Sequence, residues 1–95
     1  MYSGYGTPIN ITSKSNESNP YTVPSDGIIM LQTSGVNGLI YLSVVGGFTI
    51  SCCSVSQYDT DTTILPVFKG MKIFETPSSN GIFQVFFIPY TEDNN

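Results

Sequence analysis

Histidine, tryptophan, arginine and alanine are all absent from this 95-residue chain. Without histidine, the commonest general base in enzymes is missing, and Ser–His and Cys–His catalysis is excluded. The lack of alanine and the scarcity of leucine leave few residues that favour helices, whereas Ile, Val, Thr, Tyr and Phe, which favour strands, are abundant. We therefore expect an all-β protein that is not an enzyme.

Charge is also scarce, since only 11% of the residues are charged and the net charge is -4. The basic stripe that neutralises phosphates is missing, so neither nucleic acid nor an anionic membrane surface is an expected partner. No apolar stretch reaches the roughly 18 to 20 residues that span a bilayer, and the first residues lack the pattern of a signal peptide. We expect that the protein does not insert into a membrane. We also expect that it is made in a cytoplasm.

The chain has two cysteines, Cys52 and Cys53, which are adjacent in sequence. Side chains of neighbouring strand residues point to opposite faces, so these two thiols are not expected to pair. We interpret them as small buried or half-buried side chains. With no further Cys and no His, the ligand set of a structural metal is missing, and we expect neither a metal nor a cofactor.

Polar and apolar stretches divide the chain into three parts. Residues 1–19 form a flexible polar lead-in in which residues 8–12 suit a short edge strand, residues 20–90 form the domain, and residues 91–95 are a polar tail. Within the domain, the alternation of apolar runs and turn residues predicts strands at 28–33, 39–45, 48–56, 63–68, 71–75 and 82–90. Gly46-Gly47 and Asn80-Gly81 predict hairpins. Short strands at this spacing indicate an antiparallel β-sandwich or barrel.

The last predicted strand is apolar on both faces, which a half-buried strand is not. A chain of this length has too little mass to cover both faces of a sheet, so we expect a second copy of the protein to cover one of them. Residues 28–31 show the same double pattern. The expected subunit-interface residues are Ile29, Leu31, Ile82, Phe86, Ile88 and Tyr90.

Three segments carry a resemblance to a known family: residues 21–29 (YTVPSDGII), 65–73 (LPVFKGMKI) and 85–90 (VFFIPY). Together they resemble the head or knob domains at the tips of bacteriophage tail fibres and related receptor-binding proteins, over roughly residues 20–90. The resemblance implies a homotrimer of antiparallel jelly-roll sandwiches of the TNF and C1q kind. It also implies a virion tail protein, joined to the rest of the fibre or tail, that recognises a glycan or protein receptor on the host cell. The family carries no shared catalytic residues.

An alternative is a carbohydrate-binding or TNF/C1q-like β-sandwich module of cellular origin. In either case, binding residues are expected in loops, where variation costs little stability. The loop at 57–62 offers an aromatic ring and several hydrogen-bonding groups suited to a sugar or a protein epitope, from Gln57, Tyr58, Asp59 and Asp61. The two aspartates also permit a glycosidase pair or a calcium site, but Asp in a polar loop is typical of turn capping, which is our interpretation.

Overall fold

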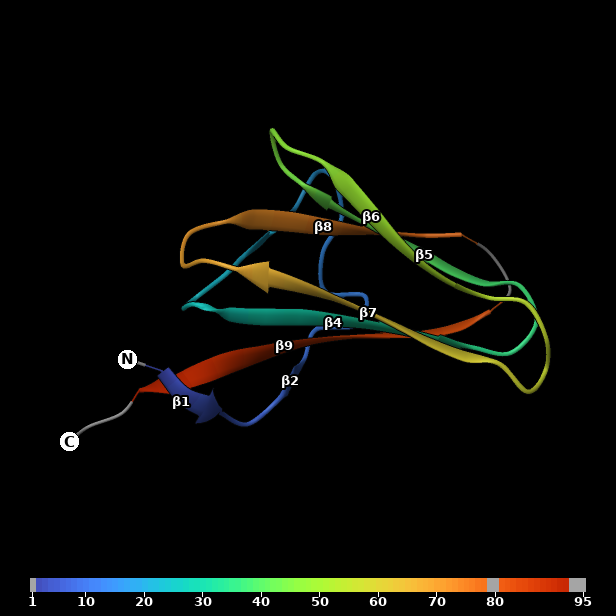
Figure 1. Ribbon diagram of the computed structural model, residues 1–95. Helices are drawn as coiled ribbons and strands as arrows, with labels where there is room; N and C mark the ends of the chain where they lie inside the picture. Colours follow the sequence, from blue (N-terminus) through green and yellow to red (C-terminus); the bar gives the residue numbers. More distant parts are fainter. Residues whose placement is uncertain (1, 79–80, 93–95) are drawn as a thin grey trace.

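The computed structural model describes residues 2–78 and 81–92, which form two antiparallel sheets stacked face to face (Figure 1). The first sheet has the strand order β1-β9-β4-β7, with β2 also paired to β9, and the second has the order β3-β8-β5-β6. The strands are β1 (Tyr2–Tyr5), β2 (Ile9–Asn10), β3 (Tyr21–Thr22), β4 (Gly27–Ser34), β5 (Gly38–Val44), β6 (Thr49–Ser54), β7 (Thr60–Val67), β8 (Lys72–Pro77) and β9 (Ile82–Glu92). The predicted all-β, antiparallel, sandwich-like architecture is confirmed. The described residues form no helix that could cross a membrane.

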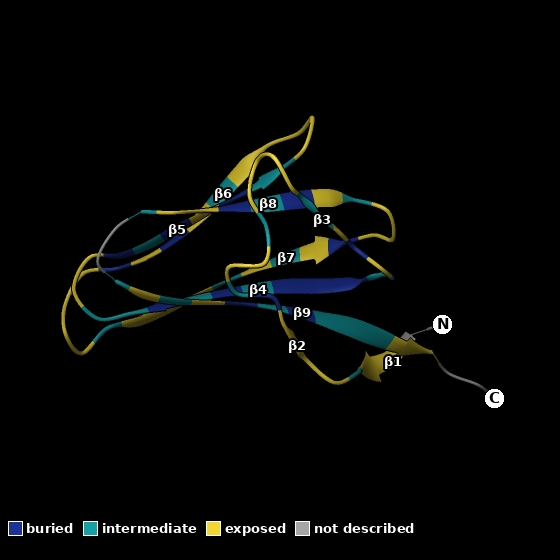
Figure 2. Ribbon diagram, turned by 180° about the vertical axis from the view of Figure 1, so that it is seen from behind, coloured by how far each residue is buried: buried dark blue, intermediate teal, exposed yellow. Residues whose placement is uncertain are grey.

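The core lies between the two sheets and is built from one side of each long strand. Val85 and Phe87 of β9 and Ile40 and Leu42 of β5 are buried in the same core cluster. Figure 2 shows buried stretches of β4 and β8 in dark blue on the two sides of this core. Alternate residues of the same strands point outward, because side chains of a strand alternate between faces. The full core cluster contains Ile11, Val23, Ile29, Leu31, Ile40, Leu42, Cys52, Val67, Ile73, Val85 and Phe87.

One open side of the sandwich is closed by side chains of β6 and β7. The Cys52 Sγ lies 3.2 Å from the carbonyl oxygen of Asp61, and the Thr63 hydroxyl donates to the carbonyl of Ser51. These contacts join an edge strand of one sheet to an edge strand of the other, so neither edge presents a fully open ladder to another chain.

The opposite side is closed by the segment that joins β2 to β3. Its Ile11 is buried in the core and its Ser13 and Ser15 donate hydrogen bonds to the two carboxylate oxygens of Glu75, at 3.0 and 3.1 Å. Glu75 is only 3% exposed, and a buried carboxylate is stable only when donors surround it. The segment therefore packs onto the sandwich, and β2 lies within the short edge strand predicted at residues 8–12.

Both ends of the predicted domain extend further than the sequence indicated. Strand β1 pairs with the last residues of β9, with Tyr2 opposite Glu92, so residues 91 and 92 are strand rather than tail. The ring centroids of Tyr5 and Tyr90 lie 5.6 Å apart across this pair. The short sequence of β1, YSGY, gave no strand signal, because its pairing depends on a partner far along the chain. The rest of the predicted tail, 93–95, lies outside the described residues.

One of the two hairpin predictions is confirmed and the other is wrong. β5 and β6 pair directly, and Gly46 between them has φ 77°, a left-handed conformation that glycine adopts without strain. By contrast, β8 and β9 belong to different sheets, so the connection before Gly81 crosses the sandwich. Asn80 itself lies outside the described residues. An Asn-Gly pair marks a reversal of the chain but does not specify which strands then pair.

Strand β1 and the β4–β5 and β6–β7 connections lie at opposite ends of the sandwich. Figure 1 shows β1 at one end, together with the β3–β4 and β7–β8 connections, and the β4–β5 and β6–β7 connections at the other. The view from behind in Figure 2 shows the same arrangement. We call the latter the loop end.

Candidate functional site

Three stretches of chain meet at the loop end and are held together by hydrogen bonds. The Gly35 amide donates to the carbonyl of Asp59 at 3.1 Å, and the Ser54 hydroxyl donates to the carbonyl of Gly35 at 2.7 Å. The Ser78 amide, just after β8, donates to the carbonyl of Leu39 at 3.1 Å. At the loop end, hydrogen bonds thus hold the β4–β5 connection, the β6–β7 connection and the end of β8 in place.

The predicted binding residues Gln57, Tyr58 and Asp59 lie in the β6–β7 connection. The Asp59 carboxylate accepts hydrogen bonds from the amides of Val55 and Ser56, at 2.9 and 3.2 Å, so it caps its own turn. The interpretation of this aspartate as a turn cap is confirmed. Tyr58 is 88% exposed and Gln57 is exposed beside it, which leaves both side chains available to a ligand.

Asp61, the fourth predicted binding residue, lies in β7 rather than in the loop. Its Oδ2 is 3.7 Å from the Sγ of Cys52, while the Asp59 carboxylate is held by backbone amides. The two aspartates therefore have separate contacts. Within residues 2–78 and 81–92, no three His, Cys, Asp or Glu side chains are grouped as a metal site would require.

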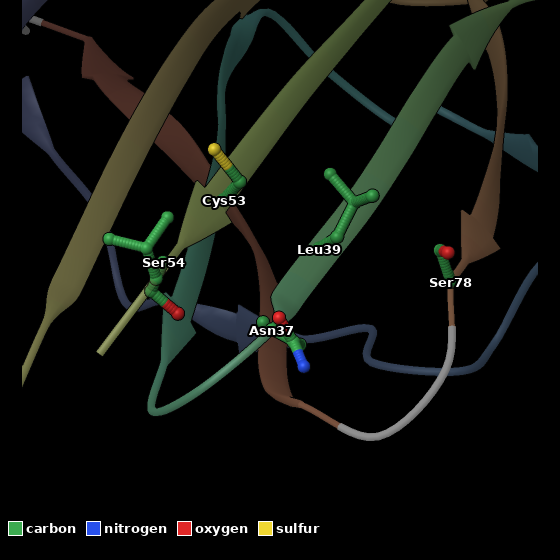
Figure 3. Close-up of a pocket in the computed structure, with 7 residues that line it drawn as sticks. Asn37, Leu39, Cys53, Ser54 and Ser78 are labelled. Atoms are coloured by element: carbon green, nitrogen blue, oxygen red, sulfur yellow. The ribbon is translucent and has the colours of Figure 1, made fainter. Parts of the chain in front are cut away.

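A shallow hollow of about 330 Å³ lies where the loop end meets the outer face of β5 and β6 (Figure 3). Leu39 and Cys53 are opposite each other on these strands, and the β4–β5 connection and the end of β8 add the remaining walls. None of the residues that line it is charged: Asn37, Gly38, Leu39, Cys53, Ser54, Val55 and Ser78. Sequence reasoning did not identify this hollow, because its residues come from three separate stretches and share no motif.

The two cysteines are unpaired and lie on opposite faces, as predicted. Cys52 is in the core, 3.5 Å from the Thr33 hydroxyl. Cys53 is exposed at the hollow, which differs from the prediction that both thiols would be at least half-buried. Strand β6 is an edge strand, and nothing in the described chain covers its outward side chains.

The outer face of the first sheet is apolar near its centre. Met30 of β4 lies between Ile64 of β7 and Phe86 of β9, and in the next row Ile28 lies between Pro66 and Ile88. Ile64 is 56% exposed, and Phe86 and Ile88 are half-buried. A polar row of Thr62, Gln32 and Gln84 follows, and Ile82 lies beyond it towards the loop end.

Two of the residues predicted for a subunit interface are in the core instead. Ile29 and Leu31 are 0% exposed and point between the sheets, so their side chains are not available to another subunit. The residues of β4 with the opposite parity, Ile28 and Met30, take their place on the outer face. Both parities of this strand are apolar, and the sequence held no sign of which one faces the core. The other predicted interface residues, Ile82, Phe86, Ile88 and Tyr90, all belong to β9, and none is in the core cluster.

The pKa of one tyrosine is shifted by packing within the chain. Tyr21 lies on β3 with its ring centroid 6.4 Å from that of Phe87, and burial raises the pKa of its phenol above the ordinary 10.0. This ring helps to close the sandwich, and it is not at the loop end.

No protein-family model, curated protein or solved structure matches this chain. The case for a function therefore depends on the sheet faces, the loop end and the hollow.

Proposed function

We propose that this chain is a non-enzymatic head domain that assembles as a homotrimer and recognises a cell surface, as the tip of a phage tail fibre does. The observation that carries the proposal is the apolar outer face of the β9–β4–β7 sheet. An exposed apolar patch flanked by polar residues is typical of a protein–protein interface.

The order of the strands supports a jelly roll of the TNF and C1q kind. β1 pairs with β9, β3 with β8, β4 with β7 and β5 with β6, so the pairs are nested as in a long hairpin folded over on itself. This nesting is the pattern expected of a jelly-roll sandwich. In trimers of that kind, a sheet face of each subunit packs towards the symmetry axis, and the β9–β4–β7 face is the apolar one here.

The separation of the two ends supports a role in binding. Strand β1 and the last residues of β9 pair at the end of the sandwich opposite the loop end, so attachment there leaves the loop end free to meet a receptor (Figure 1). Tyr58 and Gln57 present an aromatic ring and an amide there, both exposed. Such groups bind glycans and protein epitopes without a change in covalent structure.

A cell-binding assay tests this proposal. The purified domain should bind the cells of a host and compete with the phage for adsorption, and Tyr58→Ala should reduce that binding at least several-fold. Tyr41→Ala is the matched control, because Tyr41 is an exposed tyrosine in the middle of β5. Equal binding by both variants, or release of sugar fragments by the wild-type domain, would contradict the proposal.

The alternative is a carbohydrate-binding or TNF/C1q-like module of cellular origin. The exposed ring of Tyr58 supports this alternative as well as it supports a fibre tip. The genes on either side discriminate between the two. Tail and baseplate genes as neighbours favour the fibre tip, and a cellular operon favours the alternative.

A further inference from the structure

We propose that the hollow between β5, β6 and the loop end is a binding subsite for a neutral saccharide unit. The inference rests on the proposed role of the loop end in recognition and names the ligand class and the residues that would hold it. It places the subsite on Asn37, Cys53 and Ser78, beside the exposed Tyr58 loop.

Hydrogen-bonding capacity is the first argument. Within residues 2–78 and 81–92 the side chains of Asn37 and Ser78 form no hydrogen bond, so an amide and a hydroxyl are available to a ligand. The Ser54 hydroxyl is only 3% exposed and donates to the carbonyl of Gly35, so it holds the wall of the hollow in place and does not face a ligand. Sugar hydroxyls both donate and accept, and they match this mixture of groups.

The walls of the hollow also offer apolar surface. Leu39 and Val55 contribute side chains that can pack against the C–H groups of a pyranose ring, and the Cys53 thiol lies between polar and apolar neighbours. A volume of about 330 Å³ is at the small end of ligand pockets, which run from about 300 to 1,000 Å³. The hollow is open to solvent, so it fits one sugar unit whose neighbours in a chain extend outside.

Charge selects against anionic ligands. No Lys lines the hollow. Of the acidic groups nearest along the chain, Glu75 is buried and accepts hydrogen bonds from Ser13 and Ser15, and Asp59 accepts a hydrogen bond from the amide of Val55. The whole chain carries a net charge of -4. A phosphate, a uronate or a sialic acid would find no cation to offset its desolvation, whereas a neutral sugar needs none.

The hollow is held in shape before any ligand arrives. The Ser78 amide bonds to Leu39, and the β6–β7 connection bonds to Gly35. Gly38 and Gly81 approach so closely that a Cβ on Gly81 would overlap the Cα of Gly38. A rigid site loses little conformational entropy when it binds, which favours weak, small ligands such as sugars.

An array of neutral and acidic bacterial glycans tests the inference. Wild-type protein should bind at least one neutral glycan, and Ser78→Ala and Asn37→Gly should each lower that binding about tenfold. Glycine is the right replacement at position 37 because Asn37 has φ 58°. Ser51→Ala, on the same outer face of β6 but outside the hollow, should bind as wild type.

The exposed thiol gives an independent readout. Saturating amounts of the glycan identified on the array should slow alkylation of Cys53 by iodoacetamide at least several-fold. Binding to acidic glycans alone, no binding to any neutral glycan, or full Cys53 reactivity in the bound state would each overturn the inference. Those results would not contradict the proposed function, which is tested by cell binding that depends on Tyr58. Failure of the subsite and failure of the proposed function are therefore distinguishable.

Discussion

The two sheets share one core but differ on their outer faces. Outward residues of the β9–β4–β7 sheet include Met30, Ile64 and Phe86, whereas those of the β5–β6 pair include Tyr41, Ser51 and Cys53. The core lies between the sheets, so it does not account for a difference between their outer faces. The proposed assembly does: the apolar face is suited to another subunit, and the polar face of the β5–β6 pair to water.

The largest expected effect comes from a charge on the apolar face. Phe86→Asp should prevent assembly or folding, since a charge buried in an apolar contact costs several kcal/mol, about 3 or more. Tyr41→Asp puts the same charge on the polar face and should cost no more than about 1 kcal/mol of unfolding free energy. Thermal melts of both variants check this. Equal melting temperatures of the two variants would contradict the proposal that only the apolar face is covered by another subunit.

A smaller effect is expected from Ile64→Ser on the exposed edge of the apolar face. Full burial of an isoleucine side chain is worth about 1.5–3 kcal/mol, and roughly half of that remains to be gained on assembly because Ile64 is 56% exposed in the single chain. The variant should dissociate at higher protein concentration than the wild type while its subunit fold persists. Sedimentation across a dilution series measures this, and an unaltered midpoint would place β7 outside the interface.

Thiol chemistry probes the polar face. Cys53 should react with iodoacetamide at the same rate in assembled and diluted protein, and at least about tenfold faster than Cys52, which is 1% exposed. After denaturation without reductant, both should titrate as free thiols. Protection of Cys53 by assembly would mean that the polar face is also covered.

The smallest effect is expected from Tyr58→Ala at the loop end, which belongs to neither face. Tyr58→Ala should change the free energy of unfolding by no more than about 0.5 kcal/mol, because the ring is exposed. Asp59→Ala should cost about 1–2 kcal/mol, because its carboxylate accepts two backbone hydrogen bonds. Chemical denaturation compares the two, and the reverse order would contradict the assignment of Asp59 as a turn cap.

The sequence predicted strands at the positions of β2 and β4 to β9 but not β1, and it separated the two sheet faces in β9 but not in β4. Strand alternation correctly separated Phe87 from Phe86, because β9 carries an outward Gln84 that breaks the apolar pattern. In β4 both parities are apolar up to Leu31, and only the packing of the second sheet decides that Ile29 points inward. Pattern reasoning could not supply that choice, since it depends on strands far away in the chain.

The geometry of the candidate site was predicted only in part. The exposure of Tyr58 and Gln57 could be predicted, because a loop between apolar strands is exposed wherever it folds. The hollow at Cys53 could not, because it forms only when the ends of β4, β6 and β8 converge. Likewise, the segment that joins β2 to β3 and bonds to Glu75 has a polar sequence typical of a flexible segment. Its role follows from hydrogen bonds to a strand about 60 residues away.

The mass of the wild-type protein in solution tests the central claim most directly. If the apolar β9–β4–β7 face joins subunits around a three-fold axis, light scattering at micromolar concentration should give three times the 10.3 kDa chain mass, and Phe86→Asp should give no such species. A stable wild-type species of the mass of one chain would contradict the account.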